Sequence, residues 1–133
     1  MSELLRPPRG RGAVAVIAIA ALLLIASLAL ASINPKAGAY KGATSQGKQV
    51  KFKVIGGRVV NPQFTIKAGF CTGTFYMYTS GSVNSNGRFF LSSGSTEFRG
   101  RFLSKTTAKG TATATFQGCP GGTKTVGFNA HHQ

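Results

Sequence analysis

The stretch that decides the fold is QVKFKVIGGRVV, at residues 49–60. Before its two glycines, Val50, Phe52 and Val54 alternate with Lys51 and Lys53. A period of two is the period of a half-buried β-strand. Two such runs separated by a pair of glycines predict a tight β-hairpin. The stretch therefore predicts two antiparallel strands with an apolar inner face and a basic outer face.

The same hairpin predicts an irregularity in its second strand. In a plain two-residue turn, Val54 would oppose Val59, and continuing that register would turn Phe64 to the lysine face. Either the loop is longer than two residues or the second strand contains a bulge. Asn61-Pro62 is the natural place for a bulge, because proline in a sheet is confined to edges and bulges.

Alternating apolar patterns with turn signals between them continue along the chain. They predict an all-β fold, a single small domain of about eight short antiparallel strands that forms a meander barrel or a sandwich. The fourth strand is apolar on both faces, so we expect it to be central. The expected strands are 40–44, 48–55, 59–67, 73–79, 88–92, 97–103, 111–117 and 123–130.

An export segment precedes this domain. Residues 1–12 contain three arginines and one glutamate, and the 19 residues 13–31 are apolar or small and end in Ala-Leu-Ala. This is the pattern of a signal peptide cleaved before Ser32, although the run is also long enough to remain as a membrane anchor. Either outcome places the rest of the chain outside the cytoplasm, secreted or anchored. We expect a tether at 32–38, the β-domain at 39–130 and a tail at 131–133.

The exported part is strongly basic. The chain has a formal net charge of +14, and residues 32–133 carry +12 of it, with no aspartate and a single glutamate, Glu97. Lys51, Lys53, Arg99 and Arg101 all point away from the apolar face by alternation. Such residues are often only the solvated side of a sheet, but ordinary surfaces mix the two signs of charge. These four are therefore candidates for binding anionic envelope polymers or lipid head groups.

Cys71 and Cys119 are the only cysteines. An even number of cysteines in an exported domain predicts one disulfide, and neither cysteine belongs to a redox-active C-x-x-C pair. Closing a loop of about 49 residues would stabilise the fold by roughly 4 kcal/mol at most.

The residues needed for catalysis are scarce in the exported part. A serine nucleophile needs a base and an orienting acid, and glycoside hydrolysis needs two carboxylates. Glu97 is the only side-chain carboxylate there, and His131 and His132 stand together in the expected tail. We therefore expect no catalytic residues, no metal site and no cofactor.

Two faint motifs for nucleotides and nucleic acids have simpler explanations. The stretch GATSQGKQ, residues 42–49, nearly matches a phosphate-binding loop, but Gln49 replaces the required hydroxyl and a strand follows in place of a helix. The stretch RGRFLSK, residues 99–105, is similar to an RNA-recognition strand, but Phe98 and Phe102 are needed in the core. Nucleotides and nucleic acid are thus disfavoured as ligands.

A ligand cavity is the other possibility that the pattern leaves open. Phe75 and Met77, with Tyr76 and Tyr78, could line the inside of a small barrel that carries one apolar ligand. Strands of this kind also form ordinary cores. A purely structural secreted protein is a further alternative.

The chain resembles a family of small, largely uncharacterised secreted actinobacterial β-rich proteins. The resemblance rests on GAYKGATSQGKQVKFKV at 38–54, FRGRF at 98–102, one cysteine in mid-chain and a second before the last strand. It implies an exported β-domain with one disulfide and brings no catalytic residues. The family pattern includes a tryptophan near the C-terminus, where this chain has Phe128.

Overall fold

The computed structural model describes residues 32–120 and 122–133. The chain divides into two units, Met1–Ala31 and Ser32–Gln133, and the predicted export segment lies outside the described residues. Within the described part, no helix is long and apolar enough to cross a membrane. The described core consists of side chains from residues 33–130, and we expect residues 32–133 to fold as an independent domain.

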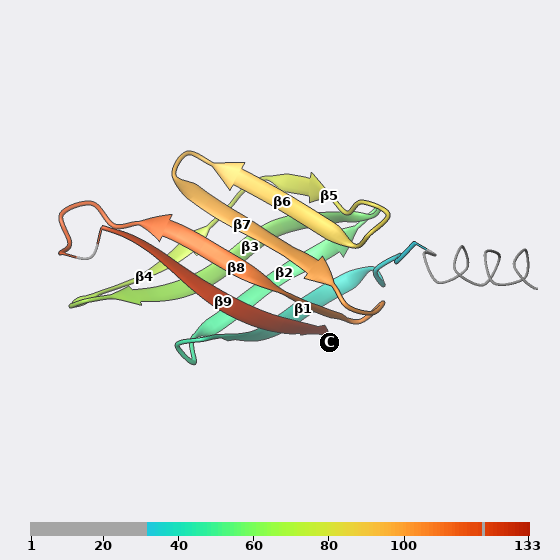
Figure 1. Cartoon of the computed structure of the whole chain (residues 1–133), viewed down its shortest axis with the longest axis horizontal. Helices are drawn as coiled ribbons and strands as arrows, with labels where there is room; N and C mark the ends of the chain where they lie inside the picture. Colours follow the sequence, from blue (N-terminus) through green and yellow to red (C-terminus); the bar gives the residue numbers. More distant parts are fainter. Residues whose placement is uncertain (1–31, 121) are drawn as a thin grey trace, which may run out of the picture. The chain divides into compact units, whose positions relative to one another are not determined.

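Nine antiparallel strands form one sheet in the described part of the chain (Figure 1). The all-β prediction is confirmed. The order across the sheet is β4-β3-β2-β1-β9-β8-β7-β6, and the short β5 pairs with β3 beside β4. The strands are β1 Gly38–Thr44, β2 Gln49–Ile55, β3 Arg58–Ala68, β4 Cys71–Tyr76, β5 Ser80–Ser82, β6 Arg88–Ser93, β7 Thr96–Phe102, β8 Thr107–Thr115 and β9 Thr123–His132.

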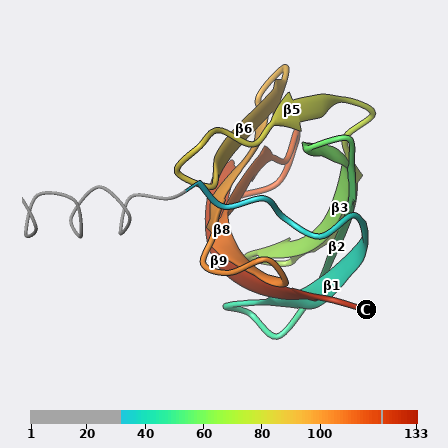
Figure 2. The same ribbon diagram turned by 90° about the vertical axis from the view of Figure 1, so that its right-hand side faces the viewer.

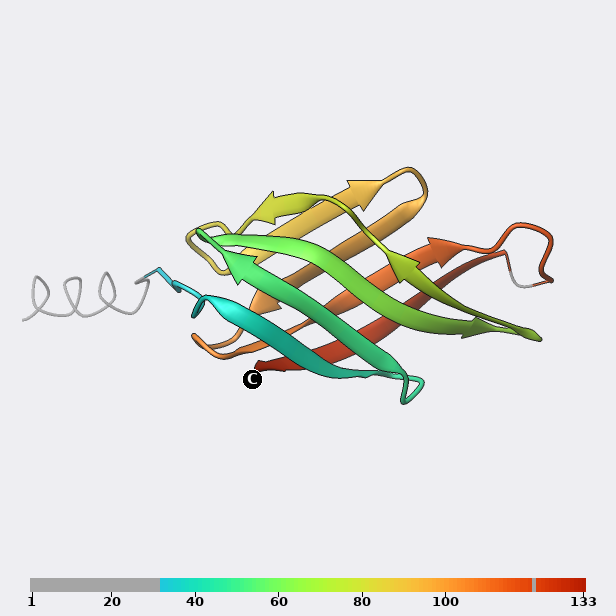
Figure 3. The same cartoon turned by 180° about the vertical axis from the view of Figure 1, so that it is seen from behind.

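The sheet curls until β5 and β6 lie next to each other (Figure 2). A Cβ atom on Gly81 of β5 would lie only 2.6 Å from the carbonyl oxygen of Phe90 on β6. In the described part, however, no ladder of hydrogen bonds joins these two strands. The domain is thus an incomplete barrel made from one sheet, with β1, β2 and β3 on the side seen in Figure 3. The sandwich alternative is set aside.

The bulge predicted in the β2–β3 hairpin is confirmed. Val54 lies opposite Val59 across a two-residue turn, and the register then shifts between Lys51 and Lys53. Two residues of β3, Asn61 and Pro62, stand against one residue of β2 at this point. Asn61 adopts a φ of 49°, in the left-handed region that asparagine tolerates better than most residues.

The strand expected at 73–79 is not central, and this prediction was wrong. β4 pairs with β3 alone in the described residues and forms one end of the sheet. Tyr76 at the end of β4 and Tyr78 just beyond it are exposed, so the side chains that suggested a strand buried on both faces lie in solvent. The strand β5 was not predicted from the sequence, because its residues are Ser-Gly-Ser and carry no apolar pattern.

Aromatic rings fill the inside of the curl. Phe98 stacks on Phe128 with 4.6 Å between ring centroids, and it also stacks on Phe64 at 5.9 Å and Phe89 at 5.8 Å. Such pairs contribute about 0.5–1.5 kcal/mol each beyond their buried area. Phe98 is fully buried and connects rings from four strands.

Glycine is required where β7 and β8 approach each other closely. Gly100 of β7 lies opposite Gly110 of β8, and both face inward between core residues. A Cβ atom on Gly110 would overlap the carbonyl oxygen of Arg99, and one on Gly100 would lie 2.7 Å from the ring of Phe89. The two strands therefore approach more closely than side chains at these positions would allow.

The predicted disulfide between Cys71 and Cys119 is confirmed, with 6.2 Å between the two Cα atoms. It joins the first residue of β4 to the loop that follows β8. The bond thereby links the end strand of the sheet to the hairpin that lies across the curl.

The segments expected as a tether and a tail are held against the domain. The Lys36 N–H donates to the Lys105 carbonyl over 2.7 Å, and β9 continues to His132. The Tyr40 hydroxyl lies 2.7 Å from the Lys36 carbonyl and 2.8 Å from the Lys105 carbonyl. Burial raises the pKa of this hydroxyl, and its hydrogen bond to Lys36 opposes the shift.

Candidate functional site

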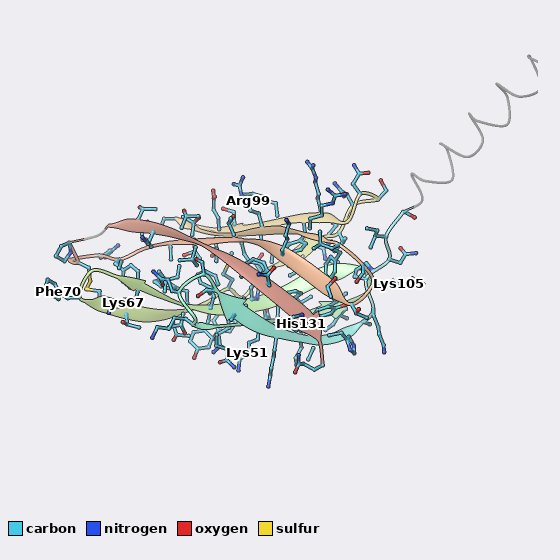
Figure 4. All side chains as sticks on the ribbon, turned by 60° about the horizontal axis from the view of Figure 1, so that its bottom comes forward. Lys51, Lys67, Phe70, Arg99, Lys105 and His131 are labelled. Atoms are coloured by element: carbon cyan, nitrogen blue, oxygen red, sulfur yellow. A yellow bond between two sulfur atoms is a disulfide. The ribbon has the colours of Figure 1, made fainter. Side chains whose placement is uncertain are left out.

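The four basic residues singled out from the sequence fall into two groups. Lys51 and Lys53 lie on the outer face of β2, and Arg99 and Arg101 lie on the outer face of β7. In Figure 4, Arg99 and Lys51 point to opposite sides of the domain. The prediction that all four point away from the core is therefore correct, but they do not make one surface.

The arginine pair belongs to an open groove of about 1230 Å³ on the outer face of β6, β7, β8 and β9. Four basic side chains line it together with the half-exposed ring of Phe90. We call this the arginine groove. Its basic residues are Arg88, Arg99, Arg101 and Lys109.

Three of these cations form a row that runs across the strands. Arg88 lies directly opposite Arg101, and Arg101 lies directly opposite Lys109. Asn129 of β9 continues the row opposite Lys109. Like charges in directly opposed positions destabilise a sheet, because their side chains are held close together. No carboxylate separates these cations, since Glu97 is the only side-chain carboxylate in residues 32–133.

Arg99 is held differently from the rest of the groove. Its guanidinium donates to the Glu97 carboxylate over 3.0 Å and lies 4.8 Å from the centroid of the Phe90 ring. Both contacts are at the surface, where an ion pair and a cation–π contact are each worth about 1 kcal/mol or less. These contacts orient Arg99 and use the single acid of the domain, which leaves the row without a carboxylate.

Opposite Thr111, the groove is lined by backbone alone, because Gly127 of β9 presents no side chain on the outer face. The β1–β2 turn borders this end. The Ser45 N–H donates to the Gly127 carbonyl over 2.8 Å, and the Gly127 N–H donates to the Ser45 hydroxyl over 3.2 Å. The groove thus has a fixed end near the middle of β9.

The lysines predicted on β2 line a second, smaller hollow of about 340 Å³. Lys41 of β1 lies opposite Lys51, and Lys53 also lines the hollow. We call these three residues the lysine face. Asn61 and Gln63 of β3 stand beside them, so the bulge brings amide groups next to the lysines.

Of the residues proposed to line a cavity, Met77 lies in the core and Phe75 is half-buried and packs against it. Met77 is 2% exposed, and Phe75 stacks on Phe64 and meets the edge of Phe116 at 5.1 Å. Neither residue lines the arginine groove or the hollow at the lysine face.

Metal ligands are also scarce. In residues 32–120 and 122–133, no three histidine, cysteine, aspartate or glutamate side chains lie close enough to hold an ion. His132 contacts the Ala37 carbonyl over 2.9 Å through its Nε2 atom, and its ring meets the edge of Tyr40. His132 therefore has a local structural contact within the segment expected as a tail.

Sequence reasoning found Arg99 and Arg101 but missed Arg88 and Lys109. Arg88 begins β6, and alternation would have placed it outward beside Phe89, which is buried. Lys109 was missed because β8 begins at Thr107, four residues earlier than its apolar pattern suggested. Which cations face one another depends on strand pairing, and the spacing of residues along the chain does not specify it.

Comparison of the chain with protein-family models, with curated proteins and with solved structures finds no match. The chemistry of the arginine groove is therefore the basis on which a function can be assigned.

Proposed function

We propose that this protein is a non-enzymatic binding module of the cell envelope, which docks on anionic polymers through the arginine groove. The observation that carries the proposal is the row of Arg88, Arg101 and Lys109, three directly opposed cations with no carboxylate among them. The row costs stability in the free protein. A bound polyanion reverses that cost, because each phosphate replaces a repulsion with an attraction.

The shape of the groove favours a chain of phosphates over a single small anion. Neighbouring strands lie about 4.8 Å apart, so a row from β6 to β9 covers roughly 14 Å. Arginine binds phosphate through two parallel hydrogen bonds, which suits it to recognise successive phosphodiester groups. An extended phosphodiester polymer can follow such a row, whereas a flat membrane surface meets only the rim of a groove.

Two further features support an envelope location. Residues 1–31 have the sequence pattern of an export signal or anchor. The Cys71–Cys119 disulfide suits an oxidising compartment, where such bonds persist. A binding module exported to the envelope would meet teichoic-type phosphodiester polymers and lipid phosphates there.

The proposal is tested by titrating residues 32–133 with a labelled glycerol-phosphate oligomer and measuring fluorescence anisotropy. We expect binding that weakens steeply between about 50 and 300 mM salt. The double change Arg101→Gln and Lys109→Gln should weaken binding about tenfold or more at low salt. The matched control, Lys51→Gln with Lys53→Gln, removes the same charge and should weaken binding less than about threefold.

Equal losses in the two double variants would mean that only net charge matters, and would contradict a specific role for the groove. No binding at low salt would refute the proposal altogether. Vesicles that contain an anionic lipid form the second arm of the test. Binding to vesicles that an excess of oligomer does not displace would assign the docking to lipid phosphates instead.

A further inference from the structure

A long segment of this basic domain carries no charged side chain. Residues 68–87 contain no lysine, arginine, aspartate or glutamate, although the chain has 16 lysines and arginines. The segment includes β4 and β5. It also presents three exposed aromatic side chains, Phe70 at 97%, Tyr78 at 85% and Tyr76 at 57% of their full exposure.

β4 is also an open edge of the sheet. Met77, just after the strand, donates its N–H to the Pro62 carbonyl over 2.9 Å. Bonded and unbonded pairs alternate along an antiparallel ladder, so Thr72, Thr74 and Tyr76 turn their backbone N–H and C=O groups away from β3. In the described residues β4 pairs with no other strand. These groups are free to pair with another chain.

Three of the usual protections of an edge strand, lysine, proline and a bulge, are missing from β4. Natural edges are blunted by lysine, proline, a bulge or a covering segment. The strand reads CTGTFY, without lysine or proline, and its ladder with β3 runs from Gln63 to Ala68 without a shift. The opposite edge, β6, is protected by β5, since Gly81 approaches the Phe90 carbonyl closely. The exposure of β4 is therefore a local feature of this edge.

We propose that β4 pairs with β4 of a second copy of this chain, and that the protein forms a two-fold symmetric dimer. Two copies of a domain with a charge of +12 repel each other wherever their basic faces meet. At the uncharged segment, two copies can approach with less repulsion than at their basic faces. Because β4 is uncharged on both copies, the contact is compatible with itself, as a two-fold interface requires.

The free backbone groups specify the register of this dimer. Centring the antiparallel pair on Thr74 places each Thr74 opposite Thr74 of the partner subunit. Thr72 then lies opposite Tyr76 of the partner subunit, so all three outward-facing positions form hydrogen bonds. The same register brings Phe70 toward Tyr78 of the partner subunit. It thereby covers the most exposed aromatic side chains of the segment.

Salt separates this dimer from the proposed polymer binding. Screening weakens attraction between the arginine groove and a polyanion, but it also weakens repulsion between two basic domains. Dimerisation should therefore strengthen as salt rises, while polymer binding weakens. The dimer proposal and the polymer-binding proposal can therefore fail independently. Their test variants change different strands, and the two equilibria respond to salt in opposite directions.

The test is sedimentation velocity on residues 32–133 over a range of concentrations up to about 200 μM, at low salt and at about 0.5 M salt. We expect a dimer whose dissociation constant falls with salt. Thr74→Lys places two like charges at the two-fold axis and should weaken the dimer about tenfold or more. Thr65→Lys is the matched control, because it adds the same charge one strand inward and breaks the same Thr65–Thr74 hydroxyl contact of 2.9 Å.

A second variant keeps the test decisive if Thr74→Lys fails to fold. The described residues contain no free cysteine, so an added one introduces a single thiol. Directly opposed residues in a bonded pair have Cα atoms about 5.5 Å apart, within reach of a disulfide. Thr74→Cys should give a covalent dimer under mild oxidation, whereas Thr65→Cys should remain monomeric. A wild-type protein that stays monomeric at high salt, or equal cross-linking of both variants, would overturn the proposal.

Discussion

Arg101 is the residue at which the proposed function and the stability of the fold conflict most directly. It lies opposite Arg88 on one side and Lys109 on the other. Repulsion among these like charges lowers the stability of the fold, and the effect is largest in the ligand-free protein at low salt. A residue that weakens the fold in this way is expected where a ligand supplies the missing charge.

Replacing Arg101 with threonine should therefore stabilise the ligand-free domain. We expect Arg101→Thr to raise the free energy of unfolding by about 0.2–1 kcal/mol at low salt, because it removes two like-charge neighbours. Urea denaturation followed by circular dichroism measures this change. The gain should disappear at about 1 M salt. Lys67→Thr is the control, since Lys67 lies opposite the neutral Thr72 and its loss should bring no such gain. A loss of stability in Arg101→Thr would contradict the repulsive row.

Tyr40 illustrates how one hydroxyl ties the chain before β1 to the rest of the domain. The hydroxyl reaches the carbonyls of Lys36 and Lys105, and the ring stacks on Phe52 at 5.1 Å. Tyr40→Phe keeps the ring and removes the hydroxyl. We expect it to lower the free energy of unfolding by about 1 kcal/mol at neutral pH.

The pH dependence of this loss follows from the raised pKa of Tyr40. An acid whose pKa is higher in the folded state than in the unfolded state is ionised first in the unfolded chain. The stability that Tyr40 contributes is therefore complete below the ordinary tyrosine pKa of 10.0 and falls as the pH rises through the higher pKa of the folded state. Urea denaturation at neutral pH and above pH 10 should show the wild-type protein approaching the Tyr40→Phe variant. A gap between the two proteins that widens with pH would contradict this assignment.

At the scale of elements, the strength of the apolar pattern decided what could be predicted from the sequence. The β2–β3 hairpin was predictable down to its bulge, because keeping Phe64 inward required a shift of register and Pro62 restricted where it could lie. The edge position of β4 was not predictable, since Tyr76 reads as apolar in a pattern although it remains exposed. The row in the arginine groove depends on which strands pair, and that is a property of the assembled sheet.

The curl of the sheet depends on glycines that the alternation of apolar residues does not reveal. Gly110 faces inward beside the carbonyl oxygen of Arg99, where a Cβ atom would overlap it. We expect Gly110→Ala to lower the free energy of unfolding by about 1–3 kcal/mol or more, because β7 and β8 must separate. Gly127→Ala is the matched control on the next strand, since its Cβ atom would meet only the Gly110 carbonyl oxygen at 3.8 Å. Urea denaturation of both variants makes the comparison, and equal losses would contradict a special role for Gly110.

At the scale of the whole molecule, the arginine groove and the β4 edge are linked through charge. The groove binds anions. Pairing of β4 between two copies is opposed by the electrostatic repulsion between two domains of charge +12. An anion bound in the groove lowers the charge of each copy and thus the repulsion between copies. Binding and dimerisation should therefore favour each other, because coupling between two equilibria is reciprocal.

This coupling can be measured with a short glycerol-phosphate oligomer that fills one groove and is too short to bridge two. At low salt we expect saturating oligomer to lower the dimer dissociation constant about tenfold, which corresponds to about 1.4 kcal/mol. Sedimentation velocity with and without oligomer measures the shift.

Thr74→Lys should bind the oligomer but remain monomeric, because its change lies at the edge and outside the groove. Arg101→Gln with Lys109→Gln should dimerise more readily than the wild-type protein without oligomer and respond less to its addition. If the wild-type protein binds the oligomer and its dimer constant does not change, the two surfaces are independent and the coupling is refuted.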